Sequence, residues 1–404
     1  MTHPVVEKKR AIPWIIFCLF LFLAFTVAPA FAERGITDET VIIGDSMDLT
    51  GPIADTTRPI SQGLRLYYEY INDLGGVHGR KIQFFSLDDQ YKTSKTLANF
   101  KILVDDKKIF ALTGIASTHA CIPLLPRIKE ENVPLITATS SEMVCIPPKR
   151  LAFVTRATRR VEVYVGIDYV MNDMDFKNVR FALVHPDNEY GRAGARAVED
   201  RLKFYGVKLV DKEIIPKPVV DLTAQILRLK RAKPDVIYVF DLAEATAVLI
   251  KTAAKYGLEP LFVGPMDSTR QDLIDIAGPA SKNYIGTATY ASWYDDVPGI
   301  TKGLREVAKR HPRFIKTRYF VAGIHQGMIA VEALKRAGRD VTVDKFIKAL
   351  ESMKDLDFGD VAAPVSYGPD SRCGSRFAKL FKVDEKIKRL VPLSGWREPL
   401  TQKP

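Results

Sequence analysis

Small hydroxyl residues gather at two places directly after predicted strands. Ser117 and Thr118 follow a strand expected at residues 110–113, and Thr139 and Ser141 follow one expected at residues 135–137. Open parallel sheets bind their ligands outside the carboxyl ends of the strands. These hydroxyl groups therefore predict a ligand-binding site, and the alternative is that they only cap the helices that follow.

The sequence lacks the motifs of the common enzyme classes. The first strand is followed by residues 44–51 without the close glycine trio of a dinucleotide-binding loop, and no G-x-x-x-x-G-K-[ST] or G-x-S-x-G motif occurs. The histidines are isolated from one another and the cysteines form no C-x-x-C pair, which argues against a catalytic base and a zinc site. We therefore expect no enzyme activity, no cofactor and no metal.

Apolar strands alternate with amphipathic helices along almost the whole chain. The alternation over residues 41–137 predicts one parallel sheet with helices on both faces, and it restarts over residues 161–263 as a second sheet. The fold class that we predict is α/β, with two Rossmann-like parallel-sheet lobes. Later segments must pack on these sheets: helices are expected at residues 303–310, 319–336 and 344–353, and a terminal hairpin at residues 377–391.

The N-terminus has the order of charges and apolar residues that is typical of a secretory signal. Basic residues 8–10 precede an uncharged run over residues 11–31, and Ala30-Phe31-Ala32 is a small-residue cleavage pattern. We predict that residues 1–32 are a signal peptide that exports the chain. An uncleaved membrane anchor is the alternative, because the apolar run approaches the length of a bilayer span.

Three cysteines remain after this segment, namely Cys121, Cys145 and Cys373. Export places them in an oxidising compartment, where an odd count leaves at least one thiol unpaired. Cys121 and Cys145 both fall in loops after neighbouring predicted strands. We therefore expect a disulfide between these two, although the sequence does not establish the connectivity.

Composition and charge restrict the classes of protein and of partner. The chain has 404 residues, of which 47% are hydrophobic and 26% charged, so the exported part folds as one large or two ordinary domains. The formal net charge is +11, and removal of the signal segment, with three basic residues and one acidic residue, leaves +11 − 2 = +9. The basic residues are scattered, which argues against nucleic acid as a partner. We expect a monomer.

Several further segments, in this order and spacing, resemble the leucine/isoleucine/valine-binding protein family, the periplasmic solute receptors of ABC importers. The resemblance implies a type I periplasmic binding protein fold, in which two lobes joined by a three-segment hinge close around a solute. It implies lobe I at residues 33–157 and 290–366 and lobe II at residues 158–289 and 367–404. It also implies ABC permease and ATPase subunits as partners. The segments that carry it are residues 49–53, 71–80, 132–136, 184–191, 234–238 and 262–265.

The resemblance also assigns roles to the hydroxyl residues. In the family, hydroxyl and amide N–H groups of the two small-residue loops hold the carboxylate of the solute. Here these positions are Thr118, Thr139 and Ser141, with Ser117 beside them. The physics agrees, because N–H groups near helix N-termini favour an anion. Tyr190 matches a position that packs on the solute from the second lobe.

The sequence departs from the family on the side that holds the amino group. Met266 stands where amino-acid binders place an acidic residue, and Asp267 comes one position later. Leu242 and Thr56 stand where aromatic residues are expected. Because a buried ammonium needs a charged acceptor, we expect an amphipathic carboxylate with an apolar or aromatic body, either an amino acid or an aromatic or aliphatic acid.

Four arginines are expected to rim the cleft or to enter the hinge, where one of them would hold a second carboxylate or stack on an aromatic ring. The alternative for each is plain surface charge. These residues are Arg58, which we include among the site residues, and Arg156, Arg159 and Arg160. The leading hypothesis is an importer receptor, and the alternative is a ligand sensor on the same fold that reports to a signalling partner.

Overall fold

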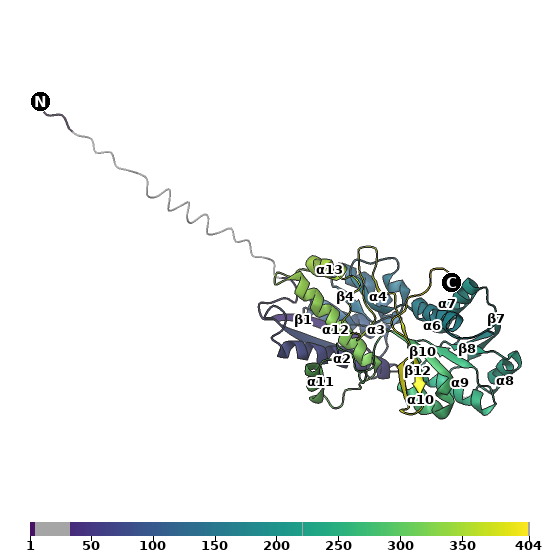
Figure 1. The fold of residues 1–404 in the computed structure, drawn as a ribbon. Coiled ribbons are helices and arrows are strands. Elements are labelled where there is room, and N and C mark those ends of the chain that lie inside the picture. The colour runs from purple at the N-terminus through teal and green to yellow at the C-terminus, as the bar shows by residue number, and fades with distance from the viewer. Residues whose placement is uncertain (5–32, 220, 403–404) are drawn as a thin grey trace.

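The computed structural model describes residues 1–4, 33–219 and 221–402. The described residues from 33 onward form two lobes that lie side by side (Figure 1). The apolar run of the predicted signal segment lies outside the described residues. Within the described part of the chain, no helix is both long and apolar enough to span a membrane.

The first lobe is built on a parallel sheet. In the described part of the chain this sheet has six strands in the order β11-β5-β4-β3-β1-β2. Its edge strand β11 comes from much later in the chain than the others. The elements that build this lobe up to residue 157 are β1 (Thr40–Met47), α2 (Ala54–Asp73), β2 (Lys81–Asp88), α3 (Thr93–Asp105), β3 (Ala111–Gly114), α4 (Thr118–Glu130), β4 (Leu135–Thr137), α5 (Glu142–Cys145) and β5 (Ala152–Ala157).

The second lobe is built on a mixed sheet. In the described residues it has seven strands in the order β13-β12-β10-β9-β8-β6-β7, and only the pairings that involve β12 are antiparallel. Its elements up to residue 288 are α6 (Arg159–Asp173), β6 (Phe181–Pro186), α7 (Glu189–Tyr205), β7 (Leu209–Ile215), α8 (Thr223–Ala232), β8 (Val236–Val239), α9 (Ala243–Lys255), β9 (Leu261–Gly264), α10 (Gln271–Ala277), the 3₁₀ helix η1 (Gly278–Asn283) and β10 (Tyr284–Ala288).

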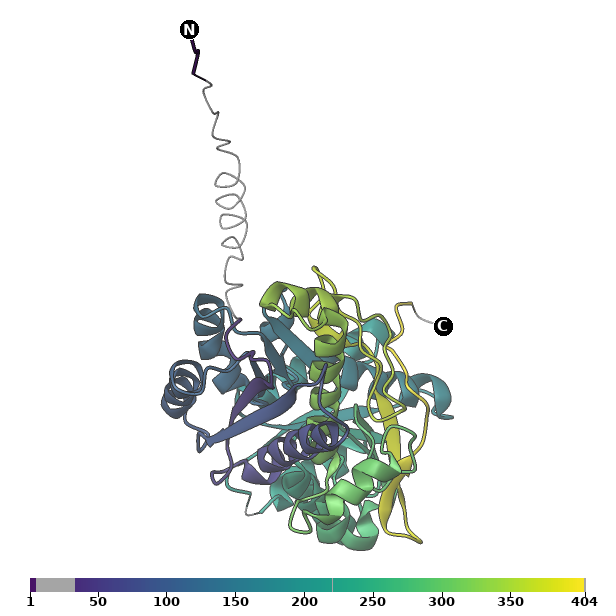
Figure 2. The same ribbon diagram turned by 90° about the vertical axis from the view of Figure 1, so that its left-hand side faces the viewer.

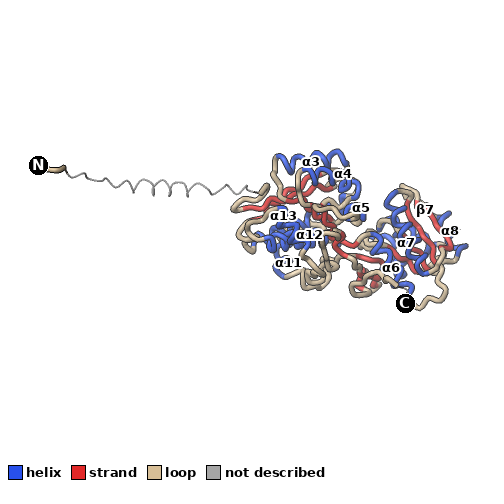
Figure 3. The backbone as a smooth tube through the Cα atoms, turned by 90° about the horizontal axis from the view of Figure 1, so that it is seen from above, coloured by secondary structure: helices blue, strands red, loops and turns tan. Residues whose placement is uncertain are grey.

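The chain passes between the two sheets between β5 and α6, after β10, and between β11 and β12. Seen from above, the two lobes are separate bodies with helices flanking the strands (Figure 3). The elements after residue 288 are α11 (Lys302–Lys309), α12 (Arg318–Ala337), α13 (Val343–Glu351), β11 (Cys373–Ser375), β12 (Lys379–Asp384) and β13 (Arg389–Pro392). The two Rossmann-like lobes and the hinge of three segments confirm the predicted fold class.

Helix α12 packs closely against α2 in the first lobe, and the two helices run across one face of its sheet (Figure 2). Two glycines allow this approach. A Cβ at Gly63 would lie 2.0 Å from the carbonyl oxygen of Phe320, and a Cβ at Gly323 would lie 2.0 Å from the carbonyl oxygen of Ile60. The backbones therefore touch where any other residue would separate them.

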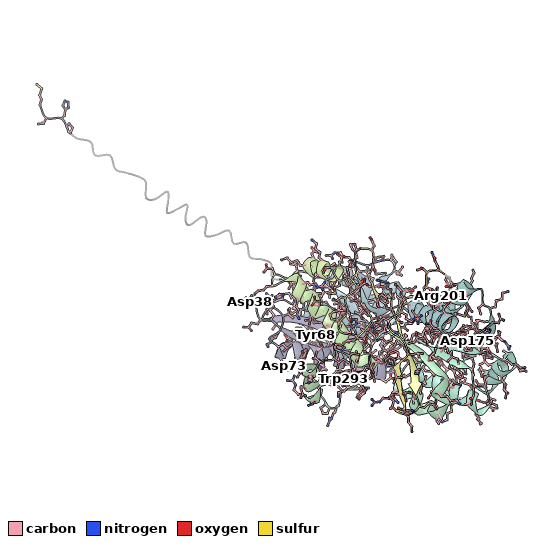
Figure 4. All side chains as sticks on the ribbon, viewed as in Figure 1. Asp38, Tyr68, Asp73, Asp175, Arg201 and Trp293 are labelled. Carbon is pink, nitrogen blue, oxygen red and sulfur yellow. A yellow bond between two sulfur atoms is a disulfide. The ribbon has the colours of Figure 1, made fainter. Side chains whose placement is uncertain are left out.

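Local sequence signals begin and end helix α7 in the second lobe. The side chain of Asn188 accepts a hydrogen bond from the backbone N–H of Gly191, and Gly206 ends the helix with a left-handed φ of 75°. Arg201, labelled in Figure 4, points from this helix to the buried carboxylate of Asp168, with Nε to Oδ1 at 2.5 Å. This buried ion pair also holds the C-terminal segment, because Arg201 donates to the carbonyl oxygen of Leu400.

Several predicted elements are found with nearly the expected bounds, whereas two central strands were not predicted. The helix expected at residues 93–105 and the strand expected at 135–137 are α3 and β4. Strands β5 and β10 were missed. Residues 373–375 were assigned to the second lobe, yet they form β11 and pair with β5 of the first sheet.

The predicted disulfide between Cys121 and Cys145 is wrong. Cys145 is bonded to Cys373, with Cα atoms 5.2 Å apart. Cys121 lies inside α4 rather than in a loop, and its buried thiol donates to the carbonyl oxygen of Ile115 at 3.2 Å. The pairing of β11 with β5 brings Cys373 to the end of α5, so residues 228 positions apart meet.

Candidate functional site

A cavity of about 690 Å³ lies between the two lobes at the carboxyl ends of their strands. The first lobe supplies the start of α2, the loops after β3 and β4, and Tyr319 at the start of α12. The second lobe supplies the loops after β6, β7, β8 and β9. Arg156 and Arg159, which flank the first crossing between the sheets, also line the cavity. The site is therefore complete only when both lobes are present.

Hydroxyl groups form part of the first-lobe wall, although not all of the predicted ones. Ser117, Thr118 and Ser140 line the cavity. Thr139 and Ser141 are buried outside the lining, where the hydroxyl oxygen of Thr139 accepts a 3.3 Å hydrogen bond from the backbone N–H of Ser141. Successive side chains of an extended segment point to opposite sides, so the cavity receives Ser140 in their place.

The predicted alternative for these hydroxyls was helix capping. Ser117 is the N-cap residue of α4 and Ser141 that of α5, yet neither side chain makes a capping hydrogen bond. The hydroxyl of Ser117 therefore does not cap α4.

Asp267 presents a carboxylate to the cavity from the loop after β9. Its oxygens accept hydrogen bonds from the hydroxyls of Tyr319 at 2.7 Å and Tyr190 at 3.0 Å, and Arg156 lies at 3.6 Å. Burial would raise the pKa of Asp267, but the Arg156 guanidinium, the charge of Arg159 and the two hydroxyls hold this pKa below its usual value. The carboxylate is therefore charged and already has three donors around it.

Arg156 is shared between two acidic residues. Its guanidinium is paired with Glu162 as well as with Asp267, and all three side chains are largely removed from solvent. Burial raises the pKa of Glu162, an effect that the charge of Arg156 partly opposes. The other oxygen of Glu162 accepts from the backbone N–H of Met266 at 3.3 Å. This network fixes the loop that carries Asp267 to the first helix of the second lobe.

Arg159 is the first residue of α6, and it lines the cavity. Its guanidinium stands over the ring of Tyr190, 5.2 Å from the centroid, and donates a long 3.4 Å hydrogen bond to the hydroxyl of Thr118. Its Nε atom is buried and, within the described residues, has no hydrogen-bond partner. Arg159 thus touches both lobes.

The mouth of the cavity carries further ion pairs. Arg270 donates to Asp55 at 2.7 Å and to the hydroxyl of Thr56 at 3.3 Å, both across the gap between the lobes, and it also pairs with Asp272. Lys217 binds both oxygens of Asp241, at 3.0 and 2.9 Å. The carboxylates of Asp55, Glu244 and Asp272 lie within 4.8 Å of one another. Because Arg270 binds two of these three, this cluster is no evidence for a metal site.

Some of the remaining predicted site residues line the cavity, and others do not. Thr56, Tyr190, Leu242 and Asp267 line the cavity. Met266 does not, because its side chain is buried and its sulfur accepts a 3.5 Å hydrogen bond from Thr289. Arg58 is exposed outside the lining, and so is Arg160, which pairs with Glu142.

Sequence reasoning missed Tyr319, Arg270, Asp55 and Ser140, all of which line the cavity. Tyr319 does not follow a strand, so no strand-end pattern marked it. Arg270 follows Ser268 and Thr269 in the loop after β9, and these hydroxyl residues could have drawn attention to it. Ser140 stood beside the predicted Thr139 and Ser141 and could have been found from the alternation of an extended segment.

Comparisons with known proteins agree with this architecture. The family model described as periplasmic binding protein matches residues 40–387. The leucine-, isoleucine-, valine-, threonine- and alanine-binding protein of Pseudomonas aeruginosa is 26% identical over 269 residues, which are 66% of this chain and 71% of that protein. The Leu/Ile/Val-binding protein of Escherichia coli K12 is 25% identical over 280 residues, 68% of this chain and 74% of that protein.

Two solved structures show the same fold. One is a branched-chain amino acid ABC transporter protein from Thermus thermophilus with bound valine, with a TM-score of 0.79, 23% identity and coverage of 90% of this chain and 97% of that one. The other is a fatty acid ABC transporter substrate-binding protein from Thermomonospora curvata, with a TM-score of 0.78, 24% identity and coverage of 91% and 94%. Because the family model matches most of its residues, this chain belongs to the periplasmic binding protein family.

Proposed function

We propose that this chain is the extracytoplasmic solute-binding component of an ABC importer and that it captures a small amphipathic carboxylate by closing its two lobes. The observation that carries the proposal is the cavity of about 690 Å³, to which both lobes contribute side chains. A cavity of this size and mixed lining suits a small organic ligand. We further propose that the protein works in the periplasm and delivers its ligand to a permease with an ATPase subunit.

The mechanism that we propose is differential binding. A ligand that touches Thr118 on the first lobe and Tyr190 on the second makes both contacts only when the lobes are close together. Its binding therefore shifts the equilibrium between open and closed forms toward the closed form. The three crossings between the sheets are the segments where the hinge would bend.

The chemistry of the walls supports an amphipathic ligand. Ser117, Thr118 and Ser140 offer hydroxyl groups, whereas Leu242 and the ring of Tyr190 offer apolar surface on the facing wall. The relatives compared above are named for the amino acids that they bind, and one of the similar structures is named for fatty acid transport. These names indicate that the fold can hold carboxylates with and without an amino group.

Ligand binding is tested on the exported protein after unfolding and refolding, which strips any bound solute. Thermal unfolding is followed with amino acids, aromatic acids, aliphatic acids and neutral sugars. A ligand at about one hundred times its dissociation constant adds roughly 2.7 kcal/mol to the free energy of unfolding. We expect stabilisation by a carboxylate and not by sugars, and the radius of gyration from small-angle scattering should fall when this ligand is added. Stabilisation by sugars alone would refute the proposal.

A matched pair of leucine variants tests whether this cavity is the site. Leu242 lines the cavity and is 44% exposed, whereas Leu227 on α8 is 45% exposed and lies outside the lining. Leu242→Glu places a charge on the apolar wall and should weaken binding by about tenfold. Leu227→Glu should leave the dissociation constant unchanged. Equal effects of both changes would place the ligand elsewhere.

A further inference from the structure

Arg159 differs from the other basic side chains that line the cavity. Arg156, Lys217 and Arg270 each have a carboxylate partner, with the closest contacts to Glu162, Asp241 and Asp272. Among the described residues, Arg159 has no carboxylate oxygen within 4.0 Å. The described walls therefore contain one guanidinium that forms no ion pair within 4.0 Å of a carboxylate, and its charge acts on Asp267 only from farther away, where it helps to lower the pKa of that carboxyl.

The surroundings of Arg159 indicate that this charge is aimed at a ligand. Its Nε atom is buried and unpartnered within the described part of the chain, and the hydrogen bond from its guanidinium to Thr118 is long at 3.4 Å. A buried donor without an acceptor is costly. A carboxylate between the Nη groups of Arg159 and the hydroxyls of Thr118 and Ser117 would make a charge-assisted, bidentate contact with this guanidinium.

Asp267 is poorly suited to hold a ligand ammonium. Its carboxylate already accepts hydrogen bonds from Tyr319 and Tyr190, and Arg156 lies beside it. An incoming ammonium would meet the positive charge of Arg156 3.6 Å from this carboxylate. Among the other acidic residues of the lining, Asp241, Asp55 and Glu189 are likewise paired, with Lys217, Arg270 and Arg196. Glu244 is exposed at the mouth, beside the carboxylates of Asp55 and Asp272.

Beside the ion pairs at the mouth, part of the lining near the surface is apolar. Tyr91, Met143 and Leu242 line the cavity and are 40%, 61% and 44% exposed, with Ile122 and Pro123 beside them in the lining. Apolar groups that are open to solvent on both walls are typical of a site that buries them against the body of a ligand.

We propose that the ligand is an organic acid without an α-ammonium group, with a branched aliphatic or aromatic body, and that its carboxylate pairs with Arg159. This inference rests on the proposed function and names the ligand class of the same site. Arg159 is then the residue that distinguishes such acids from their neutral amides, whereas the pairing of Asp267 with Arg156 and two tyrosine hydroxyls disfavours the amino acids that related proteins bind.

The test uses two sets of three compounds, and the members of each set differ in only one group. Isothermal titration of the exported protein compares 4-methylpentanoate with leucine, and 3-phenylpropanoate with phenylalanine. The neutral amide of each acid is the third member of each set. For at least one set we expect the acid to bind about tenfold more tightly, or more, than both the amino acid and the amide. This comparison needs no variant. Amino acids that bind as tightly as their acids would overturn the inference and leave the proposed function intact.

Two arginine variants assign the contact. In Arg159→Gln the affinity gap between acid and amide should close to within about threefold, because the charge that favours the acid is gone. In Arg160→Gln, a change at the exposed neighbour that pairs with Glu142, the gap should remain. A gap that persists in Arg159→Gln would overturn the assignment. If no carboxylate of any kind binds the wild-type protein, the proposed function fails and this inference fails with it.

Discussion

The guanidinium of Arg270 donates a 2.7 Å hydrogen bond to the carboxylate of Asp55 across the gap between the lobes. Arg270 precedes α10 in the second lobe, and Asp55 lies in the first turn of α2 in the first lobe. The contact therefore joins the two walls of the cavity at its mouth. Because the Asp55 side chain is 54% exposed, solvent screens the pair, and it contributes at most about 1 kcal/mol.

This contact predicts a change in the ligand-free protein. Asp55→Asn and Arg270→Gln each weaken the link between the lobes, so open forms gain population and the radius of gyration from small-angle scattering should increase. Lys101→Gln is the control, because it breaks an exposed pair with Asp105 inside the first lobe. Identical scattering from all of these proteins would show that the contact does not hold the lobes together.

Asp45 predicts a pH dependence of stability. It is fully buried on β1 beside Ser86 and Ser61, and burial raises its pKa from 3.8 to about 7. Between these two pH values the unfolded chain has released this proton and the folded chain has kept it. The free energy of unfolding therefore falls as pH rises through this window, by at most about 1.4 kcal/mol per pH unit from this residue.

Asp45→Asn removes this titration while keeping the shape of the side chain. Urea unfolding at several pH values between about 4 and 7 should show the wild type losing stability relative to the variant as pH rises. Asp38→Asn, a change at a side chain that is 96% exposed, is the control for surface charge. A constant difference between the wild type and Asp45→Asn over this range would contradict the assignment.

The disulfide predicts distinct behaviour of the three cysteines. Cys373→Ser should lower the free energy of unfolding by about 2 to 4 kcal/mol, because a long loop of the unfolded chain is released. Cys121→Ser should leave the disulfide intact. Burial raises the pKa of the Cys121 thiol to about 12, so iodoacetamide should modify it only after unfolding. Mass spectrometry of the alkylated protein would detect any pairing that involves Cys121.

The contact between α2 and α12 predicts a strong effect of one methyl group. Gly323→Ala places a Cβ against the carbonyl oxygen of Ile60, and we expect a loss of about 1 to 3 kcal/mol in the free energy of unfolding. The gain in helix propensity of about 1 kcal/mol only partly offsets this loss. Gly395→Ala is the control, because no atom lies within 4 Å of its added Cβ. Equal stability of the two variants would mean that the helices separate easily.

Helices and strands with a strong local pattern could be predicted, and strands defined by their neighbours could not. The amphipathic α3 and the apolar β4 lie where the sequence placed them. Strand β5 contains Thr155 and Arg156 among its apolar residues, and β11 is only Cys373–Ser375. These segments are strands because the sheet offers them hydrogen bonds, which is a long-range effect.

The same division holds for the site. The hydroxyl residues after the predicted strands indicated where the site lies on the first lobe, and Thr118 and Ser117 do line the cavity. Which of residues 138–141 face the cavity depends on the path of the chain after β4, and there the lining takes Ser140 rather than Thr139 or Ser141. The partners of Arg156 and Asp267 come from different segments, so no spacing along the chain could reveal them.

The sequence by itself determined the alternation of strands and helices, the two-lobed fold class and the placing of hydroxyl residues at strand ends, because these depend on periodicity and on short motifs. Only the tertiary structure decided the partner of Cys145, the pairing of Asp267 with Arg156, and the absence of a carboxylate within 4.0 Å of Arg159 among the described residues. These relationships depend on side chains that meet across two sheets, and their geometry is fixed only when the whole chain has packed.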